Sequence, residues 1–260
     1  MTTPDSDGFV RSFARGLAVL EAMGKRGAHN VASIAEATGL PRTVARRILL
    51  TLTELGYAVI DKDKSIHLTP KVLGLGMSYL TSLPFWGHAQ RVLEQLCMQV
   101  QESCAIAVFD GQDAVFVLRI PSGKIMSLRL GMGSPVPAYA TAPGRVLLAH
   151  SDHPVLHRYL EQHELKPLTP ATVTNTSDLQ DSLALIRSQG FAWVEGEFDP
   201  LVAGLAVPIY DENNQVAAAI STNLLRSEYT QAEAVEELLP QLRQASAQLA
   251  GLAPAFLHAR

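Results

Sequence analysis

The sequence predicts an α+β protein with two domains: an amino-terminal winged helix-turn-helix, joined by a linker helix to a larger domain with a largely antiparallel sheet. Two short amphipathic segments flank a glycine turn near residue 39, two β-like runs follow them, and the remaining chain mixes helical segments with six strand-like runs. A length of 260 residues suits two ordinary domains, and 47% hydrophobic residues are enough for packed cores.

Three helices are expected in the amino-terminal domain. Residues 13–23 carry apolar side chains at helical spacing, and a second helix covers residues 33–38. Gly39 supplies the tight turn, because a residue without Cβ adopts a positive φ at little cost. The third helix spans residues 41–55, with proline in its first position and Gly56 as its carboxyl cap.

A small hairpin and a linker helix complete this part of the chain. Residues 57–60 and 65–68 are β-like runs on either side of an Asp-Lys-Asp-Lys turn, which makes the helix-turn-helix a winged one. Thr69-Pro70 opens a further helix that extends to about Leu83. The resulting division is a disordered tail at 1–9, the winged domain at 10–69, the linker helix at 70–84 and the larger domain at 85–255.

The elements of the larger domain follow from hydrophobic spacing and from turn residues such as Gly111 and Gly190. Helices are expected at 85–102, 142–149, 154–161, 178–189 and 231–252, and strands at 104–109, 114–120, 124–130, 191–194, 205–210 and 215–222. Helices flanking a mostly antiparallel sheet are typical of the α+β class.

Charge divides unevenly between the two parts. Residues 1–80 hold ten Lys/Arg and seven Asp/Glu, whereas residues 81–260 hold eleven and eighteen, so the overall charge of −4 conceals a basic module joined to an acidic one. This asymmetry favours a DNA-binding module attached to a sensor domain. Ordinary fluctuation in composition is the alternative explanation.

Several classes of protein are disfavoured. The sequence has no apolar run of the ~18 residues that a membrane span requires, and its polar start resembles no signal peptide, so a cytoplasmic protein with no membrane partner is expected. Cys97 and Cys104 are too few for a disulfide framework and are expected to be buried, inert thiols. His150, His153 and His157 are expected at the surface, so neither a metal nor another cofactor is predicted.

The third helix is the predicted recognition helix, because such helices contact bases with their amino-terminal residues. Arg42 and Thr43 are placed for base contacts, and an arginine can grip guanine with two hydrogen bonds. Arg46 or Arg47 could instead only solvate a helix face, and Arg15 could pair with a carboxylate of its own domain. The candidate contacts with double-stranded DNA are Arg15, Arg42, Thr43, Arg46, Arg47, Lys62 and Lys64.

A family resemblance rests on several motifs that occur in order between Val10 and Leu252. The chain resembles the IclR family of bacterial transcription regulators, and within it the PcaR/PobR/PcaU branch that controls the catabolism of aromatic acids. The segments that carry the resemblance are RSFARGLAVL (11–20), LPRTVARR (40–47), LTPKVL (68–73), ATAPGRVLLA (140–149), GFA (190–192), LAVPIYD (205–211) and AAAIS (217–221).

The resemblance implies a ligand-responsive regulator in which the larger domain is a GAF-like effector-binding domain. It also implies self-association into a dimer or tetramer on a palindromic promoter site, and a small, possibly aromatic, acid or derivative as effector. Whether the protein represses or activates is not visible in the sequence. The cavity is expected between the sheet and the loop at 131–144, lined by Ile106, Val108, Leu128, Met132, Val136, Tyr139, Ala142, Pro143, Val202, Gly204, Ser221 and Asn223.

Two positions depart from the family pattern. Pro143 lacks the backbone N–H that the family often offers near the ligand, so neighbouring amides at the helix start are expected to bind an anion. Ala203 stands where the aromatic-acid branch tends to carry arginine. The acids Glu195, Glu197 and Asp199 are expected near the mouth of the cavity.

An enzyme is the alternative from another functional class, with the larger domain acting as a hydrolase or reductase on a small molecule. No Gly-x-Ser-x-Gly motif and no phosphate-binding glycine loop occurs, so no catalytic residue is assigned. A third interpretation is an architectural DNA-binding protein without a ligand. This interpretation assigns no function to the large apolar domain.

Overall fold

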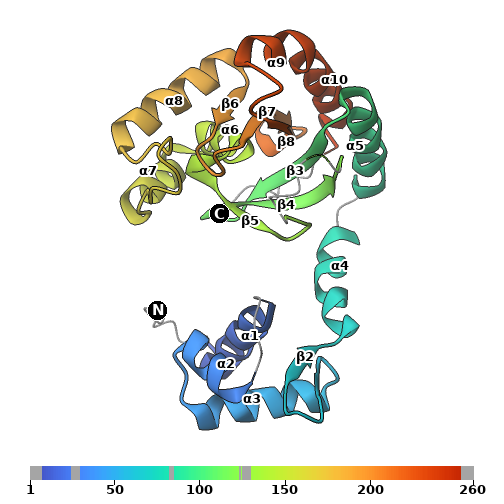
Figure 1. The fold of residues 1–260 in the computed structure, drawn as a ribbon, viewed down its shortest axis with the longest axis vertical. Coiled ribbons are helices and arrows are strands. Elements are labelled where there is room, and N and C mark those ends of the chain that lie inside the picture. The colour runs from blue at the N-terminus through green and yellow to red at the C-terminus, as the bar shows by residue number, and fades with distance from the viewer. Residues whose placement is uncertain (1–7, 25–29, 82–84, 123, 125–129, 253–260) are drawn as a thin grey trace. The chain divides into compact units, whose positions relative to one another are not determined.

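The computed structural model describes residues 8–24, 30–81, 85–122, 124 and 130–252, and it divides the chain into two compact units. Unit 1 is Met1–Tyr79 and unit 2 is Leu80–Arg260 (Figure 1). The domain boundary expected near residue 84 therefore lies a few residues earlier, within the linker helix. Of the tail expected at 1–9, only Gly8 and Phe9 belong to the described residues, and both are exposed.

Unit 1 is a three-helix module followed by a hairpin. Its elements are α1 (Arg11–Gly24), α2 (Val31–Thr38), α3 (Arg42–Glu54), β1 (Ala58–Ile60) and β2 (Ile66–Leu68). Asn30 caps α2 in a reciprocal capping box with Ser33, and Gly39 ends the helix in the left-handed conformation at φ 67°. Val19, Ile34 and Leu49, one from each helix, are fully buried and form the centre of the core.

The linker begins as a short 3₁₀ turn, η1 (Pro70–Val72), and continues as α4 (Leu73–Thr81). The hydroxyl of Thr69 caps η1 by accepting a bond from the N–H of Lys71. Leu73 and Leu75 are 70% and 53% exposed, so α4 presents apolar side chains to solvent. Within the described residues, no helix is long and apolar enough to cross a lipid bilayer.

Unit 2 is built on one six-stranded sheet, in the order β5-β4-β3-β8-β7-β6, with antiparallel pairing throughout. Its strands are β3 (Ser103–Phe109), β4 (Asp113–Ile120), β5 (Pro135–Pro137), β6 (Ala192–Glu195), β7 (Val202–Tyr210) and β8 (Val216–Leu225). Its helices are α5 (Trp86–Val100), η2 (Ala138–Ala140), α6 (Ala142–His150), α7 (His153–Gln162), α8 (Thr176–Gln189), α9 (Gln231–Glu237) and α10 (Leu239–Leu249).

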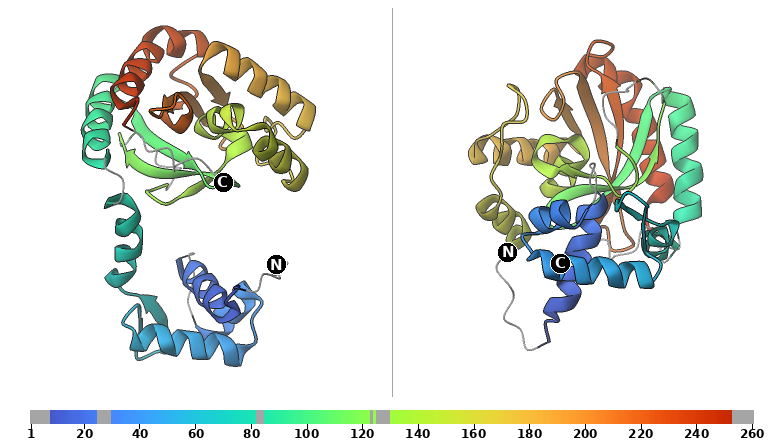
Figure 2. Two further views of the ribbon diagram at one scale, coloured as in Figure 1. Left: turned by 180° about the vertical axis from the view of Figure 1, so that it is seen from behind. Right: turned by 60° about the horizontal axis from the view of Figure 1, so that its bottom comes forward.

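Helices cover both faces of this sheet. Helices α5 and α10 pack on one face, and α6 packs on the other across β3, β7 and β8 (Figures 1 and 2). Successive side chains of a strand point to opposite faces, so Ile220 and Leu224 join the core under α5 and α10, while Ala219 joins the core under α6. We call these the α5 face and the α6 face.

Some predicted boundaries were wrong for identifiable reasons. The single carboxyl-terminal helix expected at 231–252 is two helices, because Pro240 lacks an N–H to continue α9 and instead occupies the first turn of α10. Strand β7 begins three residues earlier than expected, at Val202, and β5 was not expected at all. Of the strand expected at 124–130, residues 125–129 lie outside the described residues, and Lys124 lies in a bend.

Candidate functional site

The amino-terminal turns of α3 present a basic surface. Arg42, Thr43 and Arg46 are exposed, while Ala45 and Leu49 on the opposite side of the helix are buried. Neither guanidinium has a hydrogen bond or an ion pair with the residues that the structure describes. Both arginines are therefore available to an external anion or to base edges.

An open apolar groove lies on another side of unit 1, between α1, α3 and α4, with a volume of about 770 Å³. Arg15 and Arg47 line this groove, so they are placed apart from Arg42 and Arg46. Phe13 and Leu17 on α1 are 68% and 42% exposed. The lining is completed by Val10, Ser12, Gly16, Leu20, Val44, Ile48, Thr51, Leu52, Leu55, Tyr57 and Leu75.

The hairpin turn carries Lys62 and Lys64 in exposed positions. The neighbouring acids are occupied elsewhere: Asp61 lies 3.0 Å from Nε2 of His67, and Asp63 accepts bonds from the N–H and hydroxyl of Ser65. In the described part of the chain, neither lysine has an ion-pair partner. Both ammonium groups are free to meet a phosphate.

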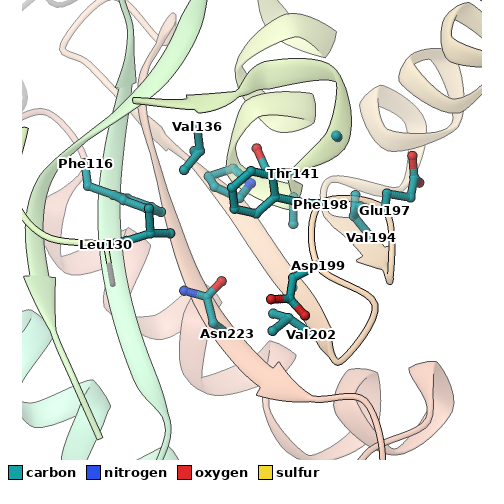
Figure 3. A pocket seen from close by; sticks show the side chains of 14 residues that line it. Phe116, Leu130, Val136, Thr141, Val194, Glu197, Phe198, Asp199, Val202 and Asn223 are labelled. Atoms are coloured by element: carbon teal, nitrogen blue, oxygen red, sulfur yellow. The ribbon is translucent and has the colours of Figure 1, made fainter. Parts of the chain in front are cut away.

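Unit 2 contains a cavity on the α6 face of its sheet, beside the start of α6. Phe116 and Leu130 lie on one side of it, Val194 and Glu197 on the other, and the ring of Phe198 lies between them (Figure 3). The other lining residues are Val136, Ala140, Thr141, Ala142, Pro143, Asp199, Val202, Gly204 and Asn223. The volume is about 30 Å³, which admits a water molecule but no aromatic ring.

Two glycines allow α6 to pack in close contact with η2 and β7. A Cβ on Gly144 would lie 2.3 Å from the Cα of Ala138, which no packing adjustment can accommodate. A Cβ on Gly204 would lie 3.1 Å from the Cβ of Ala142. The helix start therefore rests on β7 at the edge of the cavity, where the N–H groups of Ala142 and Gly144 precede the first intrahelical bonds. Pro143 supplies none.

The side-chain amide of Asn223 has a hydrogen-bond donor with no acceptor among the described residues. It lies on β8 opposite Gly204 and Ser103, and it lines the cavity. Its Nδ2 atom is buried and has no hydrogen-bond partner among the described residues. An unsatisfied buried donor costs free energy of about 1–3 kcal/mol, so this amide is placed to donate to a ligand oxygen.

A buried ion pair supports one wall of the cavity. Nη2 of Arg145 lies 2.5 Å from Oε2 of Glu197, and both side chains are less than a tenth exposed. Glu197 also accepts the N–H of Val173 at 2.9 Å, and Nε of Arg145 donates to the carbonyl of Tyr139 at 2.7 Å. Burial lowers the pKa of Arg145, while the carboxylate of Glu197 opposes that change. The pair connects α6 to the loop that carries Phe198 and Asp199.

Arg119 is a second cation on the α6 face, and it has no acidic partner among the residues that the structure describes. It pairs with Ala105 on β3, which in turn pairs with Ser221 on β8. Its Nη1 donates to the carbonyl of Leu130 at 2.7 Å, and its buried Nε has no partner among the described residues. Burial lowers the pKa of Arg119. Arg119 is not one of the lining residues, but it is bonded to Leu130, which is, so this half-buried cation adjoins the lining and is suited to an anionic ligand.

Six of the predicted lining residues do surround the cavity, and they are Val136, Ala142, Pro143, Val202, Gly204 and Asn223. Leu128 lies outside the described residues. Met132 is 55% exposed and does not reach the cavity. Tyr139 is buried in the core nearby, and its hydroxyl donates to the carbonyl of Lys166 at 2.9 Å.

Two other predicted positions, Ile106 and Val108, were wrong because of the face on which they lie. Ile106 and Val108 belong to the core under α5, on the far side of the sheet from the cavity. Ala203 lies in that same core, so its difference from the family pattern does not concern the cavity. Ser221 lies on the α6 face with Ala105, but it is fully buried and outside the lining, with its hydroxyl 3.5 Å from the carbonyl of Ala105.

Of the acids expected near the mouth, Glu197 and Asp199 line the cavity, whereas Glu195 pairs with Arg226 at 2.5 Å. The lining residues that were not predicted are Phe116, Leu130, Ala140, Thr141, Val194 and Phe198, and Arg119 was not predicted either. One signal could have revealed Arg119: it is the single charge within the apolar run Ala114–Ile120.

Comparisons with known families match both units. The IclR helix-turn-helix domain matches residues 12–62, and the description "bacterial transcriptional regulator IclR C-terminal" matches residues 77–250. The Pca regulon regulatory protein of Pseudomonas putida is 37% identical over 249 residues, which are 95% of this chain and 85% of the relative.

Solved structures agree with these matches. The crystal structure of a transcriptional regulator from Rhodococcus sp. RHA1 is 35% identical with a TM-score of 0.80, over 94% of this chain and 98% of that one. The inducer-binding domain of a double mutant of PobR from Acinetobacter, in complex with 3-hydroxybenzoic acid, is 28% identical with a TM-score of 0.59. That likeness covers 63% of this chain and 95% of the domain.

Proposed function

This chain belongs to the IclR family of bacterial transcriptional regulators, and we propose that a small hydroxylated carboxylic acid, bound in unit 2, controls its binding to promoter DNA. The observation that carries the proposal is the pair of unsatisfied donors, Asn223 Nδ2 and Arg119 Nε, on the face of the sheet that holds the cavity. We place the protein in the bacterial cytoplasm, where promoter DNA lies.

Unit 1 supplies the DNA contacts in this proposal. The first turns of α3 enter the major groove, so that Arg42, Thr43 and Arg46 reach base edges. Lys62 and Lys64 on the hairpin contact phosphates, which makes the affinity fall steeply with salt concentration. Arg15 and Arg47 line the apolar groove, and we assign them to its rim and not to base contacts.

The donors and acceptors of unit 2 define the class of effector. Arg119, Asn223 and the free N–H groups at the start of α6 suit a carboxylate, which accepts several bonds. Asp199 offers a carboxylate oxygen to a hydroxyl group of the ligand, and the rings of Phe116 and Phe198 suit an aromatic body. The structure of PobR with 3-hydroxybenzoic acid makes hydroxybenzoates the first probes to use.

The small cavity gives the proposal a switching mechanism. An aromatic acid cannot enter about 30 Å³, so binding requires Phe198 and Leu130 to move outward. Phe198 follows Glu197, whose ion pair with Arg145 ties this loop to α6. The acid therefore stabilises an open arrangement of loop and helix. A ligand that binds the open state more tightly than the closed state shifts the equilibrium between them.

The acid-binding role of Arg119 makes a specific prediction. Arg119→Ala should weaken the binding of an effector acid by about 10-fold to 100-fold, because a charge-assisted bond contributes roughly 1.5–3 kcal/mol. DNA affinity without effector should not change. The measurement is isothermal titration calorimetry with each of a panel of hydroxybenzoates, beginning with the 3-hydroxy and 4-hydroxy isomers.

Arg158→Ala is the matched control, because Arg158 is an exposed arginine of the same unit on α7. It should bind the acid as the wild-type protein does. Equal affinity in Arg119→Ala and the wild-type protein would remove Arg119 from the site. If no hydroxybenzoate or other hydroxylated acid in the panel bound the wild-type protein, the proposed effector class would be wrong.

Self-association is proposed through the apolar groove of unit 1 and the exposed side chains of α4. A groove of about 770 Å³ with Phe13, Leu17 and Leu75 around it is costly to leave in water. A second copy of the chain presents the same apolar surface, so two copies can cover each other in a symmetric contact. A dimer also presents two recognition helices to a palindromic site.

Phe13→Glu should therefore convert the protein to monomers at micromolar concentrations, since it puts a charge into this contact. Sedimentation velocity or light scattering measures the mass directly. Leu185→Glu is the matched control, because Leu185 is a 59% exposed leucine on α8 of unit 2, and this variant should keep the wild-type mass. A Phe13→Glu protein that remains dimeric would rule out this interface.

The chemistry of unit 2 favours ligand binding over catalysis. Ser221 is fully buried against the carbonyl of Ala105, with no histidine bonded to it in the part of the chain that the structure describes. We propose that the acid is bound and released unchanged. Incubating a binding acid with the protein, followed by chromatography, tests this, and any turnover would contradict it.

A further inference from the structure

Two thiols meet at the junction between α5 and β3. Cys97 lies in the last turn of α5 and Cys104 is the second residue of β3, and both are free and buried. Gln101 ends the helix in the left-handed conformation, at φ 57°, so the chain reverses tightly between the two cysteines. They lie in the core under α5, on the opposite face of the sheet from the effector cavity.

Both sulfur atoms are directed to one oxygen. Sγ of Cys97 donates to the carbonyl of Glu102 at 3.1 Å, and Sγ of Cys104 donates to the same oxygen at 3.6 Å. Cys97 also lies 3.8 Å from the carbonyl of Ile120. The shared acceptor places both sulfur atoms within hydrogen-bonding distance of the same oxygen, on the same side of the strand.

The surroundings make the two thiols unequal. The neighbouring Cys104 thiol lowers the pKa of Cys97 to about 7, whereas the proximity of Cys97 and burial raise the pKa of Cys104. Glu102 opposes a thiolate at Cys97, but Lys124 partly neutralises that carboxylate through a contact of 2.6 Å. An attacking thiolate and a resolving thiol side by side are the usual parts of a redox-active pair.

We propose that Cys97 and Cys104 are a dithiol site that hydrogen peroxide oxidises to an intramolecular disulfide. The Cys97 thiolate attacks one oxygen of the peroxide, which breaks the O–O bond, gives a sulfenic acid and releases hydroxide that takes up a proton to become water. Cys104 then attacks the sulfenic sulfur, which forms the S–S bond and releases a second water. The two thiols lose two electrons and two hydrogens, and the peroxide is reduced to two waters.

This assignment differs from the inert thiols expected from the sequence, because spacing alone did not reveal the shared acceptor. The disulfide would join the end of α5 to the strand on which Ser103, next to Cys104, pairs with Asn223. The inference does not depend on the identity of the effector or of the DNA.

Mass spectrometry of the full-length protein tests the proposal. The reduced protein is treated with one equivalent of hydrogen peroxide, alkylated with iodoacetamide and digested with trypsin, which leaves both cysteines in the single peptide 92–119. We expect this peptide unalkylated and lighter by about 2 Da than its reduced form, with full recovery of both thiols after dithiothreitol. Cys97→Ser and Cys104→Ser should each lack the lighter species.

Three results would overturn the proposal. They are a peptide that still takes up two alkyl groups, a peptide in which each sulfur gains oxygens independently, and a disulfide that joins two chains on a non-reducing gel. The wild-type protein alone distinguishes these outcomes from the expected one, so the test does not depend on either serine variant folding normally.

Discussion

Arg46→Ala should weaken binding to a specific duplex by about 10-fold to 100-fold, and Arg42→Ala by a similar factor. Each arginine can form two bonds to a guanine edge, which are worth about 1–3 kcal/mol of discrimination. Both side chains are exposed and unpaired within the described residues, so neither change removes an interaction of the folded protein. Thermal unfolding of both variants should therefore match the wild-type protein.

Fluorescence anisotropy with two duplexes separates base contacts from phosphate contacts. The first duplex is selected by the protein from a random-sequence library, and the second is an unrelated sequence. Loss of a base contact weakens binding to the first far more than to the second, whereas loss of a phosphate contact weakens both equally. Lys62→Ala is the phosphate control, and it should lower both affinities and reduce the salt dependence.

If Arg42→Ala and Arg46→Ala both bound the selected duplex with wild-type affinity, α3 would not be the recognition helix. Equal losses on the two duplexes would instead place both arginines against phosphates. Either result would require a different docking of unit 1 on DNA.

The second large effect concerns stability. Glu197→Ala should lower the free energy of unfolding of unit 2 by about 3–5 kcal/mol, because it leaves the buried Arg145 guanidinium without its carboxylate. It also leaves the N–H of Val173 without its acceptor. Urea denaturation followed by tryptophan fluorescence measures this, since both tryptophans, Trp86 and Trp193, lie in unit 2.

Two control variants identify the cause. Glu197→Gln keeps an acceptor for Val173 and removes only the charge, so its loss should be smaller than that of alanine. Replacing both partners, as Arg145→Met with Glu197→Leu, should recover much of the loss, because the unpaired charge is then gone. A destabilisation below about 1 kcal/mol for Glu197→Ala would show that the pair is solvated and does not hold the loop to α6.

The fold of unit 1 could be predicted closely because its signals are local. Gly39 and Gly56 both adopt positive φ where the sequence indicated a turn and a helix end, at 67° and 77°. Pro41 directly precedes α3, as a residue that cannot donate to a preceding turn. In unit 2, the prediction of a single helix at the carboxyl end was wrong. The apolar spacing continues through Pro240, but the backbone hydrogen bonding of the helix does not.

The cavity was harder to predict because it depends on which face of a strand meets α6. Alternation along β3 correctly groups Ile106 with Val108, but alternation does not say which group faces which helix. Ala105 and Ala107 occupy the α6 face, where small side chains leave room for the helix. Phe198 comes from a loop without periodicity, so no pattern placed it in the lining.

Arg119 shows the opposite case. A lone arginine in an apolar strand is a local signal, but its meaning depends on its neighbours in space, and among the described residues none of these is acidic. The same holds for Cys97 and Cys104, whose common acceptor is a backbone oxygen.

Effector control of DNA binding is tested by the affinity for the selected duplex, measured by anisotropy with and without an acid that raises the Tm of the wild-type protein. In the wild-type protein, the acid should change the Kd for the duplex by about tenfold or more. Arg119→Ala should bind the duplex equally well without acid and should not respond to it. An unchanged Kd in the wild-type protein, or the same response in Arg119→Ala, would contradict control of the DNA-binding unit through this cavity.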